Sequence, residues 1–223
     1  MKLAYPEKQI LIHVPRGKIS FLIIENVSLM EVITIEAKKT VERKSDQIRL
    51  YEQEERKDMH LCSEVILTPL DLTYEKKDIQ KKLGMIVLRV AEEQNFICRF
   101  TETNGEWVSL LEEIDFCLDC QLDYETDVGL NELMKIYNVR IAEPQGTFSE
   151  RFIEYAENLH RMLGKYLFVV INCGAYIKSE EYRYIKETAQ LYDLAILFIE
   201  SRQNQLLASE NTYIIDEDLC EIH

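Results

Sequence analysis

The sequence has few glycines, and none lies where a nucleotide-binding loop needs them. A P-loop requires two glycines five residues apart followed by lysine and serine or threonine, because backbone N–H groups and the lysine cradle the phosphates. The seven glycines include no pair at that spacing, and no pair at the closer spacing of a dinucleotide-binding loop. We therefore expect neither a bound nucleotide cofactor nor ATP hydrolysis.

Other absences narrow the class of protein further. No apolar run approaches the roughly 18 residues of a membrane-spanning helix, and the first residues lack an apolar signal segment. We expect a cytoplasmic protein with no membrane partner. No serine stands in a G-x-S-x-G pattern and no nucleophile has a base beside it, so we predict no catalytic residue.

The cysteines form no framework. All six are scattered and most have apolar neighbours, which is typical of reduced thiols. Cys117 and Cys120 make one CxxC pair, without the second pair or nearby histidine of a common zinc site. Zinc or redox chemistry there is the weaker interpretation of this pair.

Positive charge is scarce and unevenly placed. The formal net charge is −14, which by itself argues against nucleic acid, whose binding depends on neutralising phosphates. Residues 1–49 nevertheless carry a net charge of +3, whereas residues 100–134 hold ten acids and no base. The average hides a basic end and a very acidic patch.

Hydrophobic periodicity predicts an α/β protein with a helical insertion. Strands are expected at 8–14 and 19–25, joined by a turn around Pro15, Arg16 and Gly17, and a helix follows at 28–42. Further strands are expected at 47–52, 167–174, 193–200 and 212–222, and further helices at 75–98, 106–122, 128–137, 148–163 and 178–190. Alternating strands and helices indicate a mostly parallel sheet.

The two ends of the chain build this sheet. Residues 1–72 and 144–223 are expected to form an α/β head domain, and residues 73–143 an inserted α-helical leg domain. The turn after strand 21–25 lies where a phosphate loop would stand, but Asn26 or Ser28 suffices to cap the helix there. The apolar strand LFVVIN ends in Asn172, whose amide is a poorer Mg²⁺ ligand than a carboxylate. The interpretations are a nucleotide fold without nucleotide chemistry, or an ordinary α/β core.

The acidic patch is the strongest candidate for a site. On a helix, Asp115, Asp119 and Asp123 lie one turn apart and repel by a few tenths of a kcal/mol per pair. Solvent, a basic partner or a divalent cation offsets such repulsion, and carboxylates suit Ca²⁺. Asp123-x-Glu125-x-Asp127 is similar to the start of an EF-hand loop, but the glycine and the final glutamate of that loop are missing. A Ca²⁺ site here is therefore expected to combine several segments or subunits, and a solvated acidic face is the alternative.

Basic residues suggest a weak phosphate-contacting patch. The candidates are Lys18, Lys38, Lys39, Arg43 and Lys44. Four of them lie at the end of the first predicted helix, where the helix dipole favours cations in any case. Because one copy is only weakly basic, binding of DNA requires several copies brought together.

Taken together, the sequence resembles the short form of a CRISPR-associated adaptation protein of type II-A systems, the Csn-two family. The stretches that carry this resemblance are FLIIENV with its helix, LDYETDVGLNELMKIYNVRI, LFVVINCGAYIKSEEY, LAILFIES and YIIDEDLCEI. Their order and spacing extend over nearly the whole chain.

The resemblance implies a fold and a function. It implies a degenerate P-loop-NTPase-like α/β head with a helical leg, and a homotetrameric ring that binds double-stranded DNA ends and is stabilised by Ca²⁺. It implies action in spacer acquisition without enzymatic activity, alongside other CRISPR adaptation proteins and the type II effector nuclease. The implied Ca²⁺ ligands are Asp123, Glu125 and Asp127, with Asp119 nearby.

Two other functions remain open on the sequence. One is a divalent-metal-dependent nuclease or NTPase, because two-metal catalysis also uses converging carboxylates. The other is a protein scaffold whose acidic leg binds a basic partner. Metal-dependent cleavage or hydrolysis distinguishes the first, and absence of both DNA binding and turnover distinguishes the second.

Overall fold

The computed structural model describes residues 1–202 and 211–222. It contains two compact units, a head unit formed by Met1–Thr73 with Glu143–His223 and a leg unit formed by Tyr74–Ala142. Within the described residues, no helix combines the length and the apolar character needed to cross a membrane. The predicted division into a head domain, residues 1–72 and 144–223, and an inserted leg domain, residues 73–143, stays a prediction.

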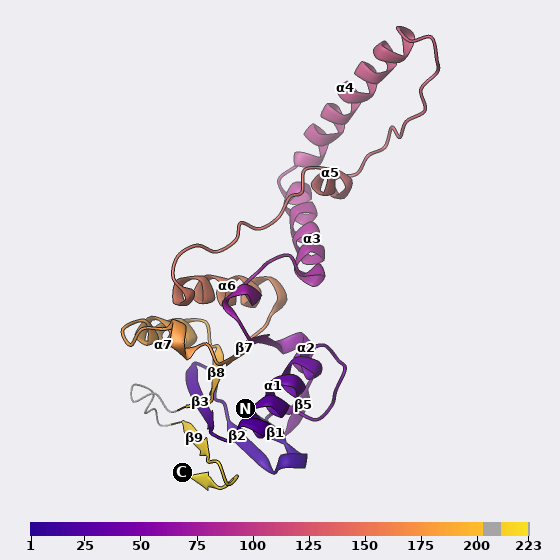
Figure 1. Cartoon of the computed structure of the whole chain (residues 1–223). Coiled ribbons are helices and arrows are strands. Elements are labelled where there is room, and N and C mark those ends of the chain that lie inside the picture. Colours follow the sequence, from indigo (N-terminus) through magenta and orange to yellow (C-terminus); the bar gives the residue numbers. More distant parts are fainter. Residues whose placement is uncertain (203–210, 223) are drawn as a thin grey trace. The chain divides into compact units, whose positions relative to one another are not determined.

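A six-stranded sheet forms the centre of the head unit (Figure 1). In spatial order its strands are β10 (Glu221–Ile222), β9 (Thr212–Ile215), β3 (Lys18–Ile24), β8 (Ala195–Glu200), β7 (Leu167–Ile171) and β6 (Ser63–Ile66). Neighbouring strands are parallel except at β10, which returns antiparallel to β9. The predicted mixed α/β fold with a largely parallel sheet is confirmed, and β3, from near the start of the chain, lies between β8 and β9 from its end.

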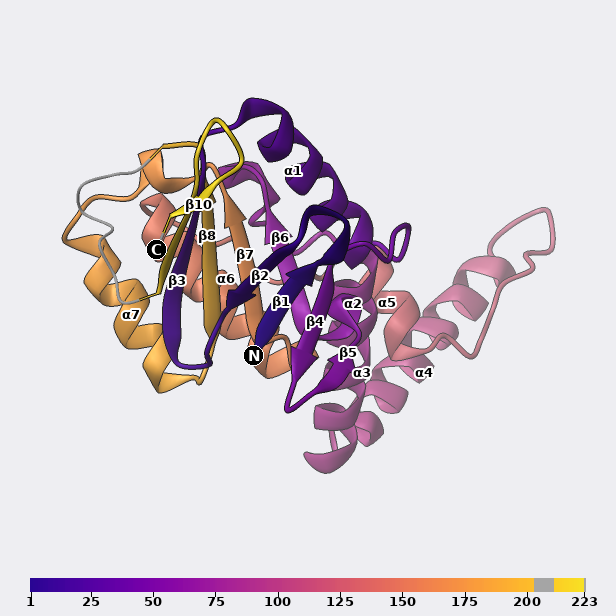
Figure 2. The same ribbon diagram turned by 90° about the horizontal axis from the view of Figure 1, so that it is seen from below.

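Apolar side chains cover both faces of this sheet, as expected for parallel strands. In β7, Leu167, Val169 and Ile171 belong to the core cluster that includes α1 (Val27–Val41) and the smaller sheet. Phe168, the next residue along from Leu167, meets Phe152 of α6 (Phe148–Leu163) edge to face on the other side. Figure 2 shows the smaller sheet in front of the central one, with α6 and α7 (Glu181–Leu191) behind.

The smaller sheet is antiparallel, and half of it was not predicted. Its spatial order is β2 (Ile10–His13), β1 (Lys2–Tyr5), β4 (Arg49–Glu52) and β5 (Glu55–Lys57). The expected strands 8–14 and 19–25 exist as β2 and β3, but the turn between them carries the chain from one sheet to the other. Arg16 fixes this crossing, because its Nε donates to Glu52 at 2.8 Å and its guanidinium lies 3.7 Å from the centre of the Tyr166 ring.

Local signals set the helices of the head unit. Asn26 caps α1, since its side chain accepts the N–H of Leu29 at 2.9 Å. A capping box of Thr147 and Glu150 starts α6, and Gly164 ends it with φ of 73°. Both predictions, 28–42 and 148–163, are confirmed within one residue. The short helices are η1 (Pro6–Lys8), α2 (Met59–Cys62), η2 (Pro69–Asp71) and η3 (Gly174–Tyr176).

The leg unit contains three helices, and the predicted bounds of two of them are wrong. They are α3 (Lys77–Glu93), α4 (Phe96–Phe116) and α5 (Leu130–Ile136). The predicted helix 75–98 ends early because Asn95 adopts a left-handed conformation with φ of 57°, which asparagine tolerates. The predicted helix 106–122 begins ten residues earlier, at Phe96, and ends at Phe116.

Candidate nucleic-acid and metal-binding residues

The turn between β3 and α1, where a phosphate loop would stand, is filled by the protein's own polar groups. The Asn26 side chain accepts from Leu29 N, and its amide donates to the carbonyl of Glu217 at 2.9 Å. The N–H of Glu25 donates to the carbonyl of Ile215, also at 2.9 Å. The terminal segment that closes the turn brings the carboxylate residues Asp216 and Glu217, which makes the turn unfavourable for phosphate.

The carboxyl edge of the sheet holds one acid that was overlooked in the sequence. Asn172, after β7, has φ of 53° and accepts the N–H of Ser201 at 3.1 Å, so its amide ties two strand ends together. The strand LAILFIE, which follows later in the chain, ends in Glu200, an acid in the position that Asn172 occupies in LFVVIN. Glu200 is only 9% exposed and accepts the N–H of Gly174 at 2.8 Å. A Cβ at Gly174 would lie 3.0 Å from this carboxyl, so a larger residue there would displace the carboxyl by a few tenths of an ångström.

Burial dominates the electrostatics at this edge. It raises the pKa of the Glu200 carboxyl above its usual 4.5, although backbone N–H groups of Gly174 and Cys173 act in the opposite direction. It also raises the pKa of the Cys173 thiol to about 12, with a further contribution from Glu200. Both groups are enclosed by the fold, which is poor geometry for a hydrated Mg²⁺ ion.

Stability is expected to depend on pH through Glu200. In the folded protein this carboxyl keeps its proton to a higher pH than in the unfolded chain, where it ionises near 4.5. Above that pH the folded state binds more protons than the unfolded state, so the free energy of unfolding falls as pH rises. Glu200→Gln is therefore expected to gain stability relative to the wild type as the pH rises above 4.5, by about 1.4 kcal/mol per unit of raised pKa. Urea unfolding across this range measures the difference, and a difference that stays constant with pH would contradict the assignment.

The part of the acidic patch that holds the predicted Ca²⁺ ligands, residues 119–127, lies outside helices. Because α4 ends at Phe116, the predicted one-turn stacking of Asp115, Asp119 and Asp123 on a helix is wrong. The chain instead turns back alongside α4 (Figure 1). Leu122 N donates to the Asp115 carboxylate at 2.7 Å, and the Asn104 amide donates to the carbonyl of Thr126 at 2.8 Å.

The predicted Ca²⁺ ligands share this returning segment but do not form a site within one chain. Asp119, Asp123, Glu125 and Asp127 are all exposed, whereas Leu122 beside them is half-buried. Among the residues that the structure describes, no three acids, histidines or cysteines lie close enough together to hold a metal ion. Cys117 and Cys120 are also exposed on the turn that follows α4. The ligand set thus stays a prediction, and it requires groups from elsewhere.

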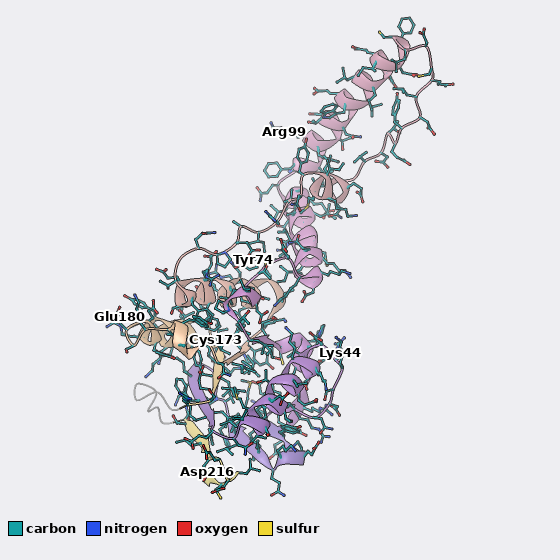
Figure 3. All side chains as sticks on the ribbon, in the orientation of Figure 1. Lys44, Tyr74, Arg99, Cys173, Glu180 and Asp216 are labelled. Carbon is teal, nitrogen blue, oxygen red and sulfur yellow. The ribbon has the colours of Figure 1, made fainter. Side chains whose placement is uncertain are left out.

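The candidate DNA contacts gather at one end of α1, apart from Lys18, which begins β3. Three of them have carboxylate partners: Lys39 with Glu36 at 2.8 Å, Arg43 with Asp58 at 2.6 Å and Lys44, labelled in Figure 3, with Glu42 at 2.7 Å. Exposed ion pairs contribute about 0–1 kcal/mol, so a phosphate can displace such a carboxylate at little cost. The role of all five residues in DNA binding remains a prediction.

A second group of cations was not singled out in the sequence. The first two turns of α3 contain Lys77, Lys81 and Lys82, and Lys76 is the N-cap. The helix dipole opposes positive charge at an amino-terminal end, so the dipole does not account for them, unlike the lysines of α1. The segment KKDIQKK shows this group of cations in the sequence, but the negative net charge of the leg as a whole masks it.

The leg unit exposes a large apolar surface. None of the 21 residues of α4 is buried, although the helix includes large apolar side chains. Trp107, Leu110 and Ile114 follow the three- and four-residue spacing of one helix face and are exposed, and Phe116 is 92% exposed. Monomeric proteins rarely expose so many large apolar groups together, which indicates a face that another protein covers.

Comparison with known proteins places the chain in a family. The family model described as "CRISPR-associated protein (Cas_Csn2)" matches residues 25–219. Two curated proteins named "CRISPR-associated protein Csn2" are similar over 103 residues: one from Streptococcus agalactiae at 32% identity over 46% of this chain, and one from Enterococcus faecalis at 29% over 45%. These matches span 45% of the length of each relative.

A solved structure supports the fold. The crystal structure of Stu0660 of Streptococcus thermophilus superimposes on the whole of this chain and on 76% of its own, with a TM-score of 0.67 and 17% identity. At that identity the likeness establishes the fold alone.

Proposed function

The chain belongs to the Csn2 family of CRISPR-associated proteins, and from this premise we propose that it is a non-catalytic, Ca²⁺-dependent homotetrameric ring that binds the ends of double-stranded DNA. In this proposal the ring acts in the acquisition of new CRISPR spacers, together with the other adaptation proteins and the type II effector nuclease.

The exposed apolar face of α4 is the observation that carries the proposal. No residue of this 21-residue helix is buried, so packing within a single chain does not explain why the helix carries large apolar side chains. Copies of the chain that cover Trp107, Leu110 and Ile114 remove this apolar surface from water, at about 25 cal/mol per Å². Assembly also brings together the exposed carboxylates of different copies, which supports a Ca²⁺ site shared between subunits.

A ring accounts for DNA binding by a weakly basic chain. A ring brings together several copies of a patch that binds phosphate only weakly in one chain: Lys18, Lys38, Lys39, Arg43 and Lys44. The affinity for DNA then falls steeply as the salt concentration rises. The lysines of the first turns of α3 are a second candidate surface, since their placement has no local explanation. Such contacts read the charge of the backbone and not the base sequence.

Threading through a ring predicts a preference for ends without any residue that recognises an end. Linear duplex is expected to bind in the presence of Ca²⁺, whereas covalently closed circular duplex of the same sequence is not. A mobility-shift titration with each form, with Ca²⁺ or with chelator, measures this. Equal binding to both forms would remove the threading mechanism, and no binding to either would leave a protein scaffold.

The alternative is a divalent-metal-dependent nuclease or NTPase. Two-metal catalysis needs carboxylates that converge on one cleft. In a single chain the carboxylates of residues 119–127 are exposed and dispersed along the returning segment, which favours the non-catalytic proposal. Metal-dependent cleavage of the bound duplex in the same titration would favour the alternative.

A further inference from the structure

A hollow of the head unit lies at the carboxyl-terminal end of α1, between this helix and the segment from β4 to α2. Ile48 and Met59, both buried, line its apolar part, and Thr40 of the last turn of α1 lines it as well. Its other lining residues are polar or charged: Arg43, Ser45, Asp46, Arg56, Lys57 and Asp58.

Thr40 is unusual among the residues that line this hollow, because its hydroxyl lacks a hydrogen bond within the described part of the chain. Its side chain is 8% exposed, and its hydroxyl has no hydrogen-bond partner among the described residues. A helical threonine ordinarily donates to the carbonyl four residues earlier. Thr34, Thr101 and Thr103 do so, at 2.8, 3.0 and 3.0 Å. A buried hydroxyl without a partner is unfavourable, so the exception calls for a group that the chain itself does not supply.

The charges around the hollow favour an anion. Three cations line it against two carboxylates, an excess of one positive charge. Arg43 pairs with Asp58 and Arg56 with Asp46, while Lys57 pairs with Glu55, which does not line the hollow. These pairs are exposed and weak, and the forked donors of arginine match a phosphate as well as they match a carboxylate.

The negative end of the α1 dipole does not prevent an anion from binding in this hollow. The carbonyls of the last turn are already satisfied: Lys39 O accepts from Lys44 N at 2.8 Å and Thr40 O from Arg43 N at 3.0 Å. The carbonyl of Val41 lies 2.7 Å from the His60 ring nitrogen. The helix end therefore presents few free acceptors to an incoming anion.

We propose that this hollow binds the phosphate group of a small phosphorylated compound such as a nucleoside monophosphate, with the Thr40 hydroxyl and the guanidinium groups of Arg43 and Arg56 as donors. Ile48 and Met59 offer apolar contact to the rest of the compound. A terminal DNA phosphate has the same chemistry, and the NMR experiment below distinguishes the two sources. The proposal stands whether or not the chain forms a DNA-binding ring.

Titration calorimetry of the full chain with adenosine monophosphate tests the proposal, with adenosine as the ligand that lacks the phosphate. Thr40→Val is expected to weaken binding by at least about tenfold, the loss of one charge-assisted hydrogen bond. The folded protein is expected to be as stable as the wild type or more so, since an unsatisfied hydroxyl is removed. Thr34→Val, on the same helix with a hydroxyl that is already bonded, is the matched control and is expected to bind normally.

Methyl NMR locates the ligand. Adenosine monophosphate is expected to shift the methyl signals of Ile48 and Met59, and to leave Met85 of the leg unit unshifted. Wild-type affinity in Thr40→Val, or no binding of adenosine monophosphate at millimolar concentration, would overturn the proposal. A 5′-phosphorylated duplex that shifts Met59 where the free nucleotide does not would also overturn it, because the source of the phosphate would then be a DNA end.

Discussion

Replacing Lys165 with methionine is expected to lower the free energy of unfolding by about 3–5 kcal/mol. Lys165 is 5% exposed and its ammonium lies 2.5 Å from the carboxylate of Glu64, which is 4% exposed. Glu64 belongs to β6, the edge strand that pairs with β7, and Lys165 precedes β7. The substitution keeps the aliphatic volume but removes the cation that balances a buried carboxylate.

Two further variants separate this effect from a loss of packing. When Glu64→Leu accompanies Lys165→Met, most of the stability is expected to return, because an apolar pair often replaces a buried ion pair without cost. Lys44→Met, which breaks the exposed pair with Glu42, is expected to cost less than about 1 kcal/mol. Urea unfolding of the four proteins provides the measurement. A double variant as unstable as Lys165→Met would show that the charge balance is not the cause.

The elements that the sequence predicts best are those whose first and last residues are set by neighbouring residues in the sequence, such as capping residues. α6 has a capping box at Thr147 and Glu150 and a glycine at its end, so the sequence predicts both its first and its last residue. The central strands are predicted equally well, because parallel strands buried on both faces are continuous apolar runs such as LFVVI.

The errors arise where the tertiary context decides. Residues 75–122 show helical periodicity almost throughout, and only the left-handed conformation of Asn95 divides them into α3 and α4. The short strand β1 has four residues, too few for a periodic signal, and forms through pairing with β2 and β4. The turn at Arg16 carries the chain between sheets because of partners far away in sequence, Glu52 and Tyr166.

The candidate sites show the same limit. Glu200 follows an apolar strand just as a metal ligand would, but its burial and its bond from Gly174 depend on how two strand ends meet. The ion pairs of Arg43 and Lys44 likewise depend on the position of side chains that composition does not reveal. Thr40 carries no signal in the sequence, since only the structure shows that its hydroxyl is without a partner.

Removing two of the expected Ca²⁺ ligands, Asp123→Ala with Asp127→Ala, is expected to weaken the tetramer and DNA binding together. Both carboxylates are exposed on the segment that returns along α4, and a single chain gathers no metal site there within the described residues. A site shared between copies would lose two of its ligands. The DNA affinity is expected to fall at least about tenfold, because a ring gains its affinity by multiplying weak contacts.

Sedimentation velocity at low protein concentration, Ca²⁺ titration and mobility shift measure the three quantities on one preparation. Glu92→Ala with Glu93→Ala is the matched control, since it also removes two exposed acids of the leg unit but lies in α3, away from the expected ligands. If the Asp123 and Asp127 variant remained tetrameric with unchanged Ca²⁺ uptake, the ligand assignment would be wrong.

The direction of the change in DNA affinity separates the metal site from a simple effect of charge. Removing two negative charges by itself strengthens binding to a phosphate backbone, because less repulsion opposes the duplex. The control variant is therefore expected to bind DNA as well as the wild type or slightly better. Weaker binding by the Asp123 and Asp127 variant would run against electrostatics, and it follows only if these carboxylates hold together the assembly that contacts the DNA.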